Sequence, residues 1–296
     1  MLEKTQKFNF REERDFGQKL NVTFYFIKSH FRPLCRLVLL YGTPLALVSG
    51  LLSGVYQARL MQRVSGASSY DSYADLNFFS QLNSLNYFAM LFFTVVSVLV
   101  LSLAVYSYMV LYQDHDQEAE PAEVWPLVKE HLVKVIYSGI AIGVLIVLTV
   151  ALLGIGVYLS VVMSIFVIVM VREETGFVET TERCFALVKR NWWATFGFIL
   201  TAGFIQAVFG WLASIPVGMV AFLRGLQVPG MESELLLVVA SVISSVLTIY
   251  VYVISIVAVG FQYYNLVEKK DGIGYLEQAE LIGRHHQTTS ANEGHY

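Results

Sequence analysis

The run "VIYSGIAIGVLIVLTVALLGIGVYLSVVMSIFVIVMV", residues 135–171, contains no Asp, Glu, Lys, Arg or His. A single helix of this length would measure about 55 Å, whereas the hydrocarbon core of a bilayer is about 30 Å thick. The run must therefore turn inside itself or tilt heavily. Gly154-Ile155-Gly156 is the natural turn, because glycine adopts the positive φ that a tight hairpin needs. We expect two membrane-spanning helices joined there.

The rest of the chain has the composition of a membrane protein. Hydrophobic residues make up 56% of the 296 residues, charged residues make up 15%, and the mean hydropathy is +0.58. Four further runs without Asp, Glu, Lys or Arg are each long enough to cross a bilayer as a helix: 37–56, 87–112, 192–223 and 235–267. Pro216 is a plausible end or kink for the fifth helix. Together the runs predict six membrane-spanning helices.

The distribution of Lys and Arg supports six helices, because basic residues collect on the cytoplasmic side of a membrane. With six helices, 17 of the 20 basic residues fall on the side that carries both termini, and Arg59, Arg63 and Arg224 fall on the other. With 135–171 as one helix, the split becomes 11 to 9. We therefore predict that both termini are cytoplasmic. The first apolar run begins too far along the chain to resemble a secretory signal.

A motif occurs three times, each time before a helix that leaves the cytoplasm. The copies are "FYFIKSHFRPL" from Phe24, "WPLVKEHLVKV" from Trp125 and "FALVKRNWWAT" from Phe185. Bulky apolar residues recur at i, i+3 and i+7, which places them on one face of a helix. These residues are Phe24, Ile27 and Phe31; Trp125, Val128 and Leu132; and Phe185, Val188 and Trp192.

We interpret each copy as an amphipathic helix lying on the inner leaflet. The lysine of each copy flanks the apolar stripe, where a cation can reach lipid phosphates, and aromatic residues lie at headgroup depth. Trp192 and Trp193 mark the point where the fifth helix enters the bilayer. The alternative is that these helices pack on the bundle. The predicted lipid-interface residues are Phe24, Lys28, Phe31, Trp125, Lys129, Leu132, Phe185, Lys189, Trp192 and Trp193.

The predicted fold is therefore all-α and polytopic: six transmembrane helices as three hairpins, each preceded by an amphipathic interfacial helix. Residues 1–267 form a single membrane domain of pseudo-repeats at about 13–112, 121–171 and 177–267, and 268–296 form a partly disordered cytoplasmic tail. Residues 57–86 form a loop on the outer side. Gly50 and Gly54, and Gly139 and Gly143, match the GxxxG pattern of close helix packing, with dimerisation through either pair as an alternative.

The sequence offers no catalytic constellation. The apolar runs lack ionisable acid–base residues, and their hydroxyl and amide groups suit hydrogen bonds between helices rather than proton transfer. Asp114, His115 and Asp116 are typical of a solvated loop, and the histidines near the C-terminus are typical of a disordered tail. Cys35 and Cys184 are predicted to stay reduced. We expect no catalytic residue, no metal, no cofactor and no nucleic-acid partner.

Two segments carry a family resemblance: "FVETTERCFALVKRNWWATFGFIL" from Phe177 and "FQYYNLVEKKDGIGYLEQAELIG" from Phe261. They resemble uncharacterised six-helix bacterial inner-membrane proteins grouped with the membrane domain of some glycerophosphoryl diester phosphodiesterases. The resemblance implies a bacterial inner membrane, a repeat architecture and a non-catalytic role. In the fused proteins the phosphodiesterase activity belongs to a separate soluble barrel, and no stretch of this chain is long enough to form one.

Two functional hypotheses follow. The first is a non-enzymatic membrane module that organises lipid or a protein partner at the inner leaflet. The alternative is a transporter or flippase-like conduit for a lipid or apolar solute, formed between the hairpins. Membrane lipids are the expected partners, together with a possible protein partner or a homo-oligomer. An enzyme would have to use loop residues such as His131 or Glu182, for which a structural role is the simpler interpretation.

Overall fold

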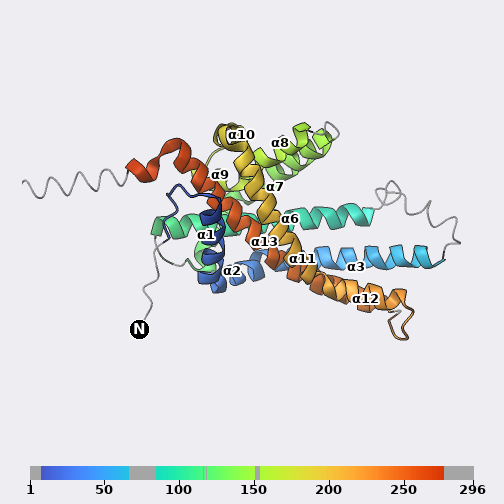
Figure 1. Ribbon diagram of the computed structural model, residues 1–296. Helices are drawn as coiled ribbons and strands as arrows, with labels where there is room; N and C mark the ends of the chain where they lie inside the picture. Colours follow the sequence, from blue (N-terminus) through green and yellow to red (C-terminus); the bar gives the residue numbers. More distant parts are fainter. Residues whose placement is uncertain are drawn as a thin grey trace, which may run out of the picture.

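The computed structural model describes residues 8–66, 85–115, 117, 119–150, 154–231 and 233–276, and this part of the chain is helical with no strand (Figure 1). Along the chain as far as residue 173, the elements are α1 (Phe16–Ser29), α2 (Phe31–Leu37), the π-helix η1 (Val38–Gly42), α3 (Thr43–Gly66), α6 (Leu85–His115), α7 (Pro121–Val150), α8 (Gly154–Met163) and α9 (Phe166–Glu173). The remaining elements are α10 (Phe177–Val188), the 3-10 helix η2 (Lys189–Asn191), α11 (Trp192–Ala213), α12 (Ile215–Gly225) and α13 (Glu234–Asp271).

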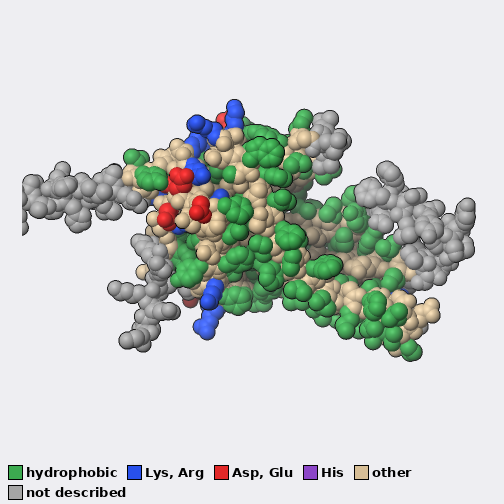
Figure 2. Space-filling view, viewed as in Figure 1, with side chains coloured by type: hydrophobic (Ala, Val, Ile, Leu, Met, Phe, Trp, Pro, Cys, Tyr) green, Lys and Arg blue, Asp and Glu red, His purple; other side chains and the backbone are tan. Residues whose placement is uncertain are grey.

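Six helical segments of the described chain are long and apolar enough to cross a membrane, which confirms the predicted all-α polytopic fold. They are Phe31–Met61, Leu85–His115, Pro121–Thr149, Gly154–Glu173, Phe177–Ala213 and Glu234–Asp271. In Figure 1 the far ends of α3 and α12 point to the right, whereas α1 and the end of α13 lie to the left. Figure 2 shows acidic and basic side chains gathered towards that left end, with apolar side chains over much of the remaining face.

Several boundaries differ from those predicted. The second copy of the motif is not a separate interfacial helix, because α7 runs without a break from Pro121 to Val150. No glycine or proline lies between Lys129 and the following span, so nothing interrupts the backbone hydrogen bonds there. The predicted turn glycines begin α8, and the connection itself, 151–153, lies outside the described residues.

The helices also extend further than predicted at their ends. α3 continues to Gly66, so the first part of the predicted 57–86 loop is helical, and 67–84 lie outside the described residues. α13 continues past residue 267 to Asp271, and of the predicted tail, 277–296 lie outside the described residues. Near Pro216 the prediction is confirmed, because α11 ends at Ala213 and α12 begins with the proline in its first turn.

The centre of the bundle is α13, which packs against α1, α3, α6, α11 and α12. Its closest neighbour is α3, and the contact depends on the first glycine pair. A Cβ on Gly50 would lie 2.8 Å from the Cα of Val242, and a Cβ on Gly54 would lie 2.6 Å from the Cα of Val238. Only glycine allows two helix backbones to approach so closely. These are contacts within one chain, as expected for helix packing.

The two glycines of the second pair, Gly139 and Gly143, have different surroundings. A Cβ on Gly139 would lie 2.5 Å from a methyl carbon of Leu99 on α6, whereas a Cβ on Gly143 would meet nothing within 4 Å. Gly139 therefore faces a flexible side chain rather than a backbone. Gly143 lies at an open position of α7, and no close packing occurs there within the described chain.

Ion pairs tie together the ends of α6, α9 and α13 and the helix α10. Arg183 on α10 donates to both carboxylate oxygens of Glu173 at 2.9 Å and also pairs with Asp271 at the end of α13. The hydroxyl of Tyr263 donates to Glu173 at 3.1 Å. Arg172, at the end of α9, donates to both oxygens of Asp114 on α6 at 2.7 Å. Four helices are therefore fixed to one another at this end.

Gly54→Ala tests the close approach of α3 and α13. The added methyl group meets the backbone of α13, so we expect a loss of about 1–3 kcal/mol in the free energy of unfolding. A thermal melt followed by tryptophan fluorescence in lipid nanodiscs measures this change. Gly143→Ala is the matched control and should leave the melting temperature unchanged or raise it, because alanine favours a helix over glycine by about 1 kcal/mol. Equal melting temperatures for Gly54→Ala and the wild type would contradict the packing argument.

Candidate functional site

The first copy of the motif is bent at its centre. α1 ends at Ser29 and α2 begins at Phe31, and the buried His30 between them stacks on Phe26 with ring centroids 4.3 Å apart. Phe24 is 41% exposed and Phe31 is 61% exposed. The two phenylalanines therefore point outward, and a different face of α1 packs on the bundle.

In the second and third copies the apolar stripe is shared between the bundle and the outside. Val128 and Val188, the middle residues, are fully buried in the core. Leu132, Phe185 and Trp192 are partly buried against that core, and Trp125 is 48% exposed. The three lysines of the motif, Lys28, Lys129 and Lys189, are all exposed. The stripe thus packs on the bundle along one edge and faces outward along the other.

A groove surrounds the third copy, at the point where α10 gives way to α11. The single 3-10 turn η2 bends the chain there and exposes Lys189 and Arg190. On one side of η2 lies a hollow of about 640 Å³ between α8 and the start of α11. On the other side lies a hollow of about 510 Å³ between α10 and the end of α13. Arg190 and Asn191 line both hollows, which we call together the η2 groove.

One wall of the η2 groove is aromatic. Trp192 stacks on Tyr158 of α8 and on Phe196, with ring centroids 5.8 Å and 5.3 Å apart. The indole N–H of Trp192 donates to the backbone carbonyl of Tyr158 at 3.4 Å. Trp193 packs edge-on against Trp192 and is 77% exposed. An amphipathic aromatic wall of this kind is typical of headgroup depth in a bilayer.

The rest of the groove is cationic. Lys189, Arg190, Lys269 and Lys270 line it, and Glu13 is the single carboxylate among its lining residues. Glu13 pairs with Lys269 at 3.4 Å. Three cations therefore remain to attract an anion, and they come from two elements that are far apart in the sequence.

Below the groove, α11 presents a broad apolar surface. Leu200, Phe204 and Trp211 are all exposed, although a helix of this composition favours apolar surroundings. α11 is part of the span Phe177–Ala213, which the rest of the described chain covers little. The aromatic wall therefore leads from the charged groove to a surface suited to hydrocarbon.

A buried lysine lies nearby and was not predicted from the sequence. Lys19 of α1 is 4% exposed, and its ammonium donates to the side-chain oxygen of Gln262 at 2.7 Å. Gln262 in turn donates to the hydroxyl of Thr195 at 2.9 Å, and the ammonium lies 4.6 Å from the ring centroid of Phe198. Burial lowers the pKa of Lys19 to about 8, with a further lowering from Lys269 and an opposing effect from Asp15.

No protein-family model, curated protein or solved structure matches this chain. Among the described residues, no group of three or more His, Cys, Asp or Glu side chains could hold a metal ion. The η2 groove and its surroundings are the features of the described chain that bear on function. Lys189, Trp192 and Trp193 were predicted from the sequence as lipid-interface residues, whereas Lys269, Lys270 and Tyr158 join them only through the fold.

The pKa of Lys19 predicts how stability changes with pH. The folded state binds fewer protons than the unfolded state between about pH 8 and the ordinary lysine pKa of 10.5. Stability should therefore rise as the pH increases through this window, by about 1–2 kcal/mol for this residue. Melting temperatures of wild type and Lys19→Met at pH 7.5 and 9.5 measure the effect, and the variant should lose this part of the rise. Lys28→Met, which removes an exposed lysine from the same helix, is the control; identical pH dependence in wild type and both variants would exclude the assignment.

Proposed function

We propose that this protein is a non-enzymatic membrane module that binds the phosphate headgroup of an anionic lipid in the η2 groove and thereby organises lipid at the inner leaflet. The observation that carries the proposal is the combination of a cationic groove with an aromatic wall at the start of an apolar, outward-facing helix. Each part matches one part of a lipid. Cations match the phosphate, Trp192 and Trp193 match headgroup depth, and the exposed side of α11 matches an acyl chain.

The inner leaflet of a bacterial inner membrane is proposed because of charge. In the six-helix arrangement, 17 of the 20 basic residues lie on the side of the termini, which is the cytoplasmic side by the positive-inside rule. The η2 groove lies on that side, as do the exposed lysines of the other two copies. Anionic lipids of the cytoplasmic leaflet attract such residues.

An internal repeat is part of the same proposal, and burial at equivalent positions supports it. The residue before each motif is buried in every copy, as are the residues ten and thirteen places after its first aromatic. These residues are Thr23, Val124 and Cys184; Leu34, Val135 and Thr195; and Leu37, Ser138 and Phe198. Each copy thus presents a corresponding face to the core, which favours three related units around one end of the bundle.

Lipid retention in native mass spectrometry tests the headgroup site. Wild type, released into neutral detergent with an equal mixture of phosphatidylglycerol and phosphatidylcholine, should retain phosphatidylglycerol in preference. The triple variant Lys189→Gln/Arg190→Gln/Lys270→Gln should lose that preference. Each cation contributes about 1 kcal/mol, so removing three lowers the affinity roughly 100-fold.

The control variant is Lys28→Gln/Lys129→Gln, which removes two exposed lysines of the motif from outside the groove. It should retain phosphatidylglycerol as the wild type does. If the triple variant keeps its preference, the groove is not the headgroup site and the proposal fails. If the control loses the preference as fully as the triple variant, binding is a diffuse property of the basic surface and the specific groove is likewise refuted.

A further inference from the structure

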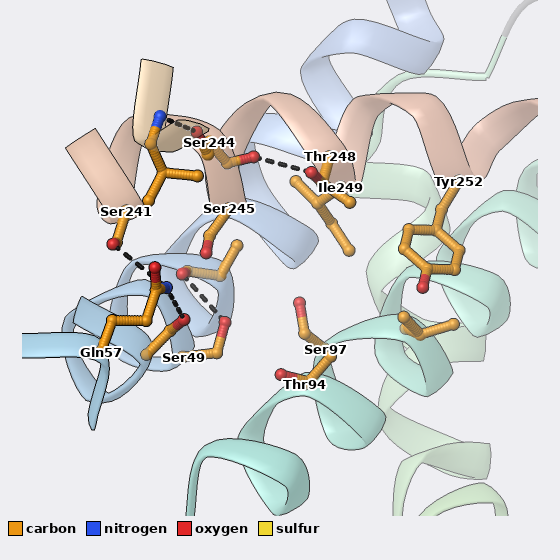
Figure 3. A pocket seen from close by; sticks show the side chains of 14 residues that line it. Ser49, Gln57, Thr94, Ser97, Ser241, Ser244, Ser245, Thr248, Ile249 and Tyr252 are labelled. Atoms are coloured by element: carbon orange, nitrogen blue, oxygen red, sulfur yellow. Dashed lines mark hydrogen bonds between the residues drawn. The ribbon is translucent and has the colours of Figure 1, made fainter. Parts of the chain in front are cut away.

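A second cavity lies in the other half of the bundle, where the structure brings α3, α6, α12 and α13 together. It has a volume of about 160 Å³, room for roughly five water molecules. Figure 3 shows serine, threonine, glutamine and tyrosine side chains of three of these helices directed towards it. Its lining contains no charged side chain. The η2 groove shares no lining residue with it.

Most hydroxyl groups of this cavity already donate a hydrogen bond to a backbone carbonyl. Ser49 donates to the carbonyl of Ala46 at 3.0 Å, and Ser97 donates to that of Gly42 at 3.2 Å. Ser241 donates to the carbonyl of Leu237 at 2.8 Å.

Thr94 and Thr248 follow the same pattern. They donate to the carbonyls of Met90 and Ser244 at 2.8 Å and 2.7 Å. An oxygen whose proton is used in this way keeps its lone pairs. Five hydroxyl groups therefore offer acceptors to whatever occupies the cavity.

The glutamine fixes one end of the cavity. The amide of Gln57 donates to the hydroxyl of Ser53 at 3.0 Å and to that of Ser241 at 3.4 Å, which joins α3 to α13. Within the described residues, the hydroxyls of Ser245 and Tyr252 form no hydrogen bond and can donate to an occupant. The lining thus combines many acceptors with a few donors.

These properties define the chemistry of an occupant. A cation would lie between apolar helices without a carboxylate to balance it, which is unfavourable at this depth. An apolar solute would leave the acceptors without partners. A neutral molecule with several hydroxyl groups brings no charge into the cavity and leaves no acceptor without a partner. Each of its hydroxyls can donate to an oxygen whose own proton is already used, and can accept from Ser245 or Tyr252. We propose that this cavity is a binding site for a small uncharged polyol of about three or four carbons.

Protection of an introduced thiol tests the proposal. In a background with Cys35→Ala and Cys184→Ala, Ser244→Cys places a thiol on the cavity wall without removing either proposed donor. Methyl methanethiosulfonate is an uncharged reagent that labels this thiol within the membrane. Glycerol and erythritol should slow the labelling several-fold in reconstituted protein. Sorbitol has six carbons, more than the proposed occupant, and should not slow the labelling. The measurement is the labelling rate by mass spectrometry across polyol concentrations.

Val239→Cys, at an exposed position of the same helix, is the matched control, and no polyol should slow its labelling. Ser53→Cys provides a second cavity thiol if Ser244→Cys does not fold, as judged by size-exclusion chromatography. Three outcomes would overturn the proposal. In the first, glycerol does not protect the cavity thiol at all; in the second, glycerol and sorbitol protect it equally; in the third, the thiol of Val239→Cys is protected to the same extent. The first of these outcomes would mean that the cavity holds only water.

Discussion

The contact between α3 and α13 at Gly50 and Gly54 is the constraint on which the rest of the structure depends. Inside a bilayer the hydrophobic effect does not drive helices together, so close packing and hydrogen bonds have to do so. The two glycines let α3 approach the backbone of α13, and α13 in turn contacts most of the other helices. The same approach brings Gln57 within reach of Ser241 and so forms one end of the hydroxyl-lined cavity. One close contact therefore positions both the central helix and the cavity beside it.

The opposite end of α13 is held by charge, and this shapes the η2 groove. Asp271 pairs with Arg183 on α10, and the two residues before Asp271 are the lysines of the groove. Arg183 also binds Glu173, which fixes the end of α9. The backbone N–H groups of Gly274 and Tyr275 donate to the buried carboxylate of Glu268, which stabilises the turn after α13. Lys269 and Lys270, the cations that α13 contributes to the groove, thus lie on a helix end that is bound on several sides.

Hydropathy and charge predicted most of the fold, because both depend on the composition of continuous segments. The six spans and the end of a helix near Pro216 follow from runs of apolar residues and from the chemistry of proline. Spacing also identified Gly50 and Gly54. The continuity of α7 could not be predicted, since the pattern of an interfacial helix and that of a helix entering the bilayer are the same at Trp125. The structure distinguishes them, because α7 continues through the motif whereas η2 interrupts the third copy.

The candidate sites were less accessible to sequence analysis for a different reason. Lys189, Trp192 and Trp193 lie close together in the chain, so they could be predicted as interface residues from a motif. Lys269 and Lys270 belong to the same groove only because α13 ends beside α10, and no local pattern reports such a contact. The same holds for Lys19, whose burial against Gln262 reverses the usual expectation for a lysine near the N-terminus. The hydroxyl groups of the cavity are likewise spread over three helices, so no local sequence pattern predicts that they line one site.

Polarity along α13 changes in a definite order from one proposed site to the other. At its C-terminal end, Asp271 and the two lysines before it carry full charges. Further along, Gln262 accepts a hydrogen bond from Lys19, whose pKa is lowered by burial. Towards the other end, Ser241 and Thr248 present only hydroxyl groups. From Lys270 to Ser241 the helix rises about 44 Å. A helix of this length is long enough to pass through a hydrocarbon core about 30 Å thick, where charge is costly and hydrogen bonds to neutral groups are tolerated. The end that carries the termini is therefore suited to an anion and the opposite half to an uncharged solute, and one continuous helix contributes residues to both.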